Sequence, residues 1–156
     1  MKHLLLTTIA AVLLVGCGPS PPDISIREAA KDGNIGAVKQ HIAAGTDVNA
    51  KGVFGWTLLL QAVAGGHKEI AELLIDNNAD VSAKDQSRTT PLHYVVAGGH
   101  KKAAELLIGK GADVNTKDAT GMTPLDFAII YNHTETADLL RKHGGKTAAE
   151  LKAEGK

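Results

Sequence analysis

Three histidines, His67, His100 and His133, recur at intervals of 33 residues along the chain. Imidazole nitrogens are common zinc ligands, so a regular set of histidines raises the question of a metal site. Ligands of one zinc ion must each lie about 2 Å from it, whereas equivalent residues on packed helices lie about 10 Å apart. We therefore expect these histidines to be structural, and we expect the chain to bind neither a metal nor a cofactor.

Other reactive side chains follow the same interval. Asp47, Asp80 and Asp113 are spaced by 33 residues, which places them in equivalent turns and not together in one site. The sequence contains no Gly-x-Ser-x-Gly, phosphate-loop or His-Glu-x-x-His motif, and its one cysteine is Cys17. These observations predict that the protein is not an enzyme, although an enzyme or small-ligand binder with an unrecognised site remains an alternative.

The interval reflects an internal repeat. Residues 57–89 and 90–122 are identical at 18 of 33 positions. The unit has Thr-Pro-Leu-His at a helix start (90–93), Gly-His at a break (99–100) and Leu-Leu in a second helix (106–107). This pattern resembles the ankyrin repeat. The resemblance implies an all-α solenoid of about four helix-turn-helix repeats joined by short hairpin-like turns, which acts as a non-catalytic protein-binding scaffold.

The predicted organisation has four parts. We expect residues 1–16 to be a signal peptide, residues 17–23 to comprise Cys17 and a proline-rich tether, and residues 147–156 to form a C-terminal cap or tail. Four repeats occupy residues 24–146, at about 24–52, 53–85, 86–118 and 119–146. The first lacks Thr-Pro-Leu-His, as terminal repeats commonly do.

The N-terminus has the pattern of a secretory signal. Lys2 precedes the uncharged stretch 4–15, which is too short to span a bilayer. The sequence Leu-Val-Gly-Cys (14–17) resembles the lipobox of bacterial lipoproteins, which implies that Cys17 is lipidated and becomes the mature N-terminus. Gly18 stands where an aspartate would favour inner-membrane retention in enteric bacteria. We therefore expect a lipid-anchored protein of the bacterial cell envelope, at the outer membrane and facing the periplasm.

Composition narrows the class of partner. The chain has 17 basic and 17 acidic residues, so it lacks the basic excess typical of nucleic-acid-binding proteins. Aromatic residues make up only 3% of the sequence, which favours a core of closely packed small aliphatic side chains over a deep pocket. We expect a monomer that binds a protein partner and no nucleic acid.

In ankyrin-like stacks the partner usually contacts the turn tips and the inner, concave face of the first helices. In the register of this chain, these positions are Lys31, Asp32, Val53, Phe54, Trp56, Gln86, Ser87, Thr89, Ala119, Thr120, Met122, Ile130 and Tyr131. Three of the five aromatic residues of the chain fall among them. Aromatic side chains often dominate the binding energy of interfaces, so this strip is the predicted partner-binding surface.

Two further alternatives remain open. Phe54 and Trp56 could instead pack against the adjacent hairpin and compensate for the missing Thr-Pro start of the second repeat. A narrower form of the binding hypothesis is an inhibitor or immunity-type protein that neutralises one envelope toxin or hydrolase.

Overall fold

The computed structural model describes residues 24–155, in which every regular element is helical. The predicted signal peptide and Cys17 lie outside these residues. First helices of seven residues alternate with second helices of nine, and a short helix follows the last pair. The elements are α1 (Ile26–Asp32), α2 (Ile35–Ala43), a 3₁₀ turn η1 (Val53–Gly55), α3 (Leu58–Ala64), α4 (Lys68–Asp76), α5 (Pro91–Ala97), α6 (Lys101–Gly109), α7 (Pro124–Ile130), α8 (Thr134–Lys142) and α9 (Ala148–Ala153).

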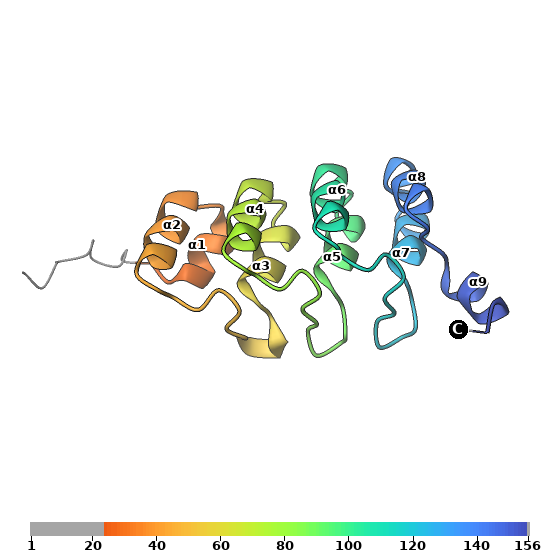
Figure 1. Ribbon diagram of the computed structural model, residues 1–156, viewed down its shortest axis with the longest axis horizontal. Coiled ribbons are helices and arrows are strands. Elements are labelled where there is room, and N and C mark those ends of the chain that lie inside the picture. The colour runs from red at the N-terminus through yellow and green to blue at the C-terminus, as the bar shows by residue number, and fades with distance from the viewer. Residues whose placement is uncertain (1–23, 156) are drawn as a thin grey trace, which may run out of the picture.

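The helix pairs form two parallel rows (Figure 1). The first helices α1, α3, α5 and α7 contact one another in sequence, and the second helices α2, α4, α6 and α8 do the same. This arrangement confirms the predicted all-helical solenoid. No helix within residues 24–155 is long and apolar enough to cross a membrane.

Hydroxyl groups begin the first helices. The side chains of Ser25, Thr57 and Thr123 each accept a hydrogen bond from a backbone N–H in the first turn. Thr90 forms a capping box with His93, and Pro91 occupies the first helical position, where a missing N–H is tolerated. A helix of seven residues is not stable alone, so these caps fix boundaries while packing supplies the stability.

The core consists of small and aliphatic side chains in equivalent positions. Leu59, Leu92 and Leu125 are fully buried in successive first helices, while Leu74 and Leu107 are buried in second helices. Buried alanines let neighbouring helices approach closely, as the low aromatic content predicts.

Three loops project from the helix rows and precede α3, α5 and α7 (Figure 1). We call residues 50–56, 83–89 and 116–122 fingers two, three and four, after the repeats that they open. Backbone hydrogen bonds join them, because the N–H of Gln86 donates to the Phe54 carbonyl at 3.0 Å and that of Ala119 donates to the Ser87 carbonyl at 2.8 Å. The fingers therefore form one continuous strip.

Several turn positions require a left-handed backbone. Asn78 has φ of 65°, in register with Gly45 and Gly111, because asparagine tolerates the left-handed conformation better than other non-glycine residues do. Arg88 has φ of 58°, in register with Gly55 and Gly121. The backbone of Arg88 is therefore sterically strained, at a position where the neighbouring repeats carry glycine.

This strain predicts that Arg88→Gly stabilises the protein. A left-handed conformation costs a non-glycine residue about 1–2 kcal/mol, and the extra freedom of glycine in the unfolded chain offsets part of that gain. We expect the free energy of unfolding to rise by about 0.5–1 kcal/mol in urea titrations. A decrease would show that the arginine side chain stabilises finger three.

The buried histidine of α5 predicts a pH dependence of stability. His93 is fully buried, and burial lowers its pKa below 6.5. The unfolded chain therefore binds the proton more readily, so stability is lost as the pH falls below about 6.5. Urea titrations between pH 7 and 5 should show a smaller loss in His93→Leu, which carries the residue found at the equivalent Leu60. Equal losses in both proteins would contradict this origin.

Candidate functional site

The structure exposes most of the predicted surface residues. They lie at the end of α1, in the three fingers and at the end of α7, and the exposed ones are Lys31, Asp32, Val53, Phe54, Gln86, Ser87, Ala119, Thr120, Ile130 and Tyr131. Trp56 and Met122 are half-buried. Thr89 is buried, and its N–H donates to the Asp85 carboxylate at 2.9 Å. The prediction that Thr89 is accessible to a partner was therefore wrong.

Trp56 packs inward, at the base of finger two. Its ring meets that of Tyr94 edge to face, with centroids 5.0 Å apart. The Tyr94 hydroxyl donates to Asp85 Oδ2 at 2.8 Å, and burial together with this hydrogen bond raises the pKa of the phenol. Trp56 therefore packs inward, but against Tyr94 of α5 in the next repeat and not against the adjacent hairpin that the packing alternative named.

Val53 and Phe54 point away from the core. Their exposed fractions are 75% and 66%, which is unusual for two adjacent large apolar side chains. Phe54 also has φ of 58°, whereas its register equivalents Ser87 and Thr120 are polar and do not adopt positive φ. Strained backbone at an exposed aromatic residue is a feature that recurs at binding sites.

A cavity of about 350 Å³ opens beside finger two, between the first helices of repeats one and two. Its lining residues are Lys31, Trp56, Gln61, Ala64 and Gly65. Among the described residues, none forms a hydrogen bond with the buried Oε1 of Gln61. The indole, the amide and the small residues at the end of α3 form a recess suited to part of a partner's side chain.

A second apolar patch lies at the end of α7. Ile129, Ile130 and Tyr131 are each more than half exposed. Sequence reasoning missed Ile129, whose register equivalents Val63 and Val96 are buried beneath the following repeat. Its exposure could have been predicted from its position in the last full repeat, because no further helix pair of the described residues covers it.

The regularly spaced histidines serve the connections between repeats. Nε2 of His67 lies 2.8 Å from the Lys31 carbonyl, and Nε2 of His133 lies 3.0 Å from the Ala97 carbonyl. His100 packs on glycine, because a Cβ at Gly66 would lie only 2.9 Å from its ring. Each ring thus contacts the preceding repeat. Within residues 24–155, no three histidine, cysteine or acidic side chains gather in a group that could hold a metal ion.

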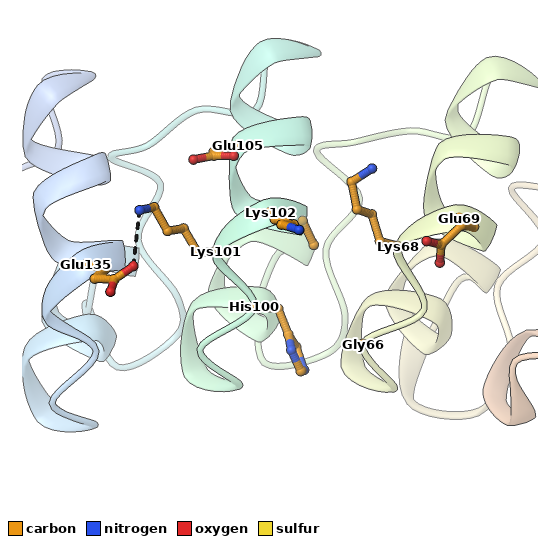
Figure 2. A pocket seen from close by; sticks show the side chains of 9 residues that line it. Gly66, Lys68, Glu69, His100, Lys101, Lys102, Glu105 and Glu135 are labelled. Atoms are coloured by element: carbon orange, nitrogen blue, oxygen red, sulfur yellow. Dashed lines mark hydrogen bonds and ion pairs between the residues drawn. The ribbon is translucent and has the colours of Figure 1, made fainter.

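A larger pocket, of about 610 Å³, lies along the N-terminal ends of the second helices (Figure 2). Its lining side chains are mainly lysines and glutamates of α4, α6 and α8, together with His100 just before α6. Lys101 pairs with Glu135 across repeats at 3.1 Å, and Lys68 pairs with Glu72 within α4. The ion pair between Lys101 and Glu135 links the second helices of repeats three and four.

Comparisons with known proteins agree with this architecture. The family model for ankyrin repeats matches residues 26–118 and 79–150, which together cover most of the chain. A mitochondrial disaggregase of Homo sapiens is 36% identical over 70 residues, and that of Bos taurus is 33% identical over 70 residues. Each match covers 43% of this chain and 10% of the disaggregase, so the chain spans about a tenth of the length of these relatives. The repeats and the family model together show that the chain belongs to the ankyrin repeat family.

Proposed function

We propose that this protein is a non-catalytic, monomeric scaffold that binds a protein partner through the fingers and the first helices. The observation that carries the proposal is the exposure of Val53 and Phe54 at the tip of finger two. Ankyrin repeats are protein-interaction scaffolds, and the partner depends on the residues displayed on them.

The energetics favour a contact at this tip. Burying a side chain such as Phe54 against a partner contributes about 1.5–3 kcal/mol. In the free protein Val53 and Phe54 are exposed to water and do not contribute this burial free energy. The left-handed backbone of Phe54 also costs about 1 kcal/mol or more. A partner that covers the tip would therefore offset a cost already present in the free protein.

The cavity beside finger two extends the proposed surface. It shares Trp56 with the finger and Lys31 with α1, and both belong to the predicted surface. A partner segment that contacts the Phe54 tip could place one side chain in this recess. The recess and the exposed tip together give the surface both a projection and a hollow, as is typical of interface hot spots.

We further propose that the scaffold is held in the bacterial cell envelope through lipidated Cys17. The lipobox pattern and the uncharged stretch before it support this anchor. Two or more acyl chains hold a protein at a membrane far more firmly than one. The proposed location is the outer membrane, facing the periplasm.

The binding proposal predicts that Val53→Ser combined with Phe54→Ser weakens partner binding. Loss of a contact that contributes about 2 kcal/mol to the free energy of binding corresponds to a roughly thirtyfold weaker affinity. The partner would be captured from envelope extracts with the native protein and then titrated against both proteins. Lys39→Ser with Glu105→Ser, on the exposed surface of α2 and α6, is the control and should bind normally. Equal affinity of the folded finger variant would contradict the proposed surface.

The anchoring proposal predicts that Cys17→Ser abolishes lipidation. The variant should appear in the soluble fraction after cell fractionation, and mass spectrometry should find no acyl groups at the N-terminus. If the variant remained with the membranes as firmly as the native protein, the proposed anchor would be wrong.

A further inference from the structure

Fingers three and four are closed by an aspartate. In finger three, Oδ1 of Asp85 accepts hydrogen bonds from the N–H groups of Ser87 at 2.8 Å and Thr89 at 2.9 Å. In finger four, Oδ1 of Asp118 accepts in the same way from Thr120 and Met122. One carboxylate thus organises the backbone of each loop from within.

Finger two has no such carboxylate, because Gly52 occupies the equivalent position. The guanidinium of Arg27, from α1 of the preceding repeat, is placed there instead. Its Nη1 donates to the Trp56 carbonyl at 3.0 Å and its Nη2 donates to the Ala50 carbonyl at 2.7 Å. A Cβ at Gly52 would lie 2.6 Å from Nη1, so any side chain at position 52 would have to displace the guanidinium.

The repeat register explains how Arg27 reaches this loop. Arg27 is equivalent to His93, whose Nε2 lies 3.3 Å from the Met122 carbonyl, and Met122 is in turn equivalent to Trp56. Arg27 therefore makes the same contact across repeats that the histidine makes. Its second donor adds a contact with Ala50, at the opposite side of the finger.

From these contacts we propose that Arg27 is a positioning residue, which holds finger two, and with it Phe54, in the conformation that meets the partner. This inference rests on the proposed function. The guanidinium is planar and permanently charged, so it can hold two carbonyl groups at once in a fixed geometry. A finger that is ordered before binding loses less conformational entropy when the partner arrives.

The first test is amide hydrogen exchange of the full chain with Arg27→Ala. Three amides of finger two donate to backbone carbonyls within the loop: Gly52 to Trp56, Gly55 to Gly52, and Trp56 to Val53. Their exchange should accelerate about tenfold or more when both charge-assisted contacts are lost. The amides of Asp85 and Arg88 in finger three are the internal control and should be unchanged.

A second readout comes from Trp56, which is the only tryptophan of the chain. Its fluorescence should shift to longer wavelength in Arg27→Ala, because a loosened finger separates the indole from Tyr94 and exposes it to water. Arg27→Lys retains the charge but not the paired geometry, so it should give an intermediate shift. This variant also serves if the alanine variant fails to fold.

The decisive arm is a rescue by Gly52→Asp in the Arg27→Ala background. Position 52 is equivalent to Asp85 and Asp118, so we expect an aspartate there to accept from the amides of finger two and to restore their protection. Unchanged exchange in Arg27→Ala, equal acceleration in finger three, or failure of the rescue would each overturn the proposal. These measurements need no partner. Two results can therefore be told apart. If Arg27→Ala loosens finger two but the Val53→Ser, Phe54→Ser variant still binds the partner normally, Arg27 orders the loop and the proposed binding surface is wrong.

Discussion

The structure depends on the burial of each short helix pair against its neighbours. First helices of seven residues are too short to persist alone, so their alanine and leucine side chains must be covered by adjacent repeats. Where a neighbour is present, Val63 and Val96 are buried, whereas the equivalent Ile129 in the last full repeat is more than half exposed. Stability in this fold is thus a property of the contacts between repeats.

Polar contacts between repeats add the alignment that apolar packing lacks. Aliphatic side chains set the distance between helices but specify orientation weakly, while hydrogen bonds to backbone carbonyls have a defined direction. His67 and His133 contact the preceding repeat, whereas Arg27 and His93 extend to the finger of the following one. Scaffold and proposed binding surface are therefore built by the same set of contacts between repeats.

The repeat period made the helices, their turns and the left-handed Asn78 predictable, because each depends on residues close in sequence. The inward packing of Trp56 on Tyr94 was not predictable, since it joins side chains of different repeats. Arg27 was equally hidden, because its role depends on Gly52 lacking a side chain. The period identifies what is common to the repeats, and the contacts specific to this protein arise where a repeat departs from it.

Site-specific photocrosslinking in living cells tests most directly whether finger two meets a partner. A photoreactive phenylalanine analogue at Phe54 would be compared with the same analogue at Lys39 on α2, which is exposed on the second-helix row. We predict a discrete crosslinked complex from position 54 and none from position 39. Crosslinking from position 39 with none from position 54 would place the partner on the opposite face and contradict the proposed surface.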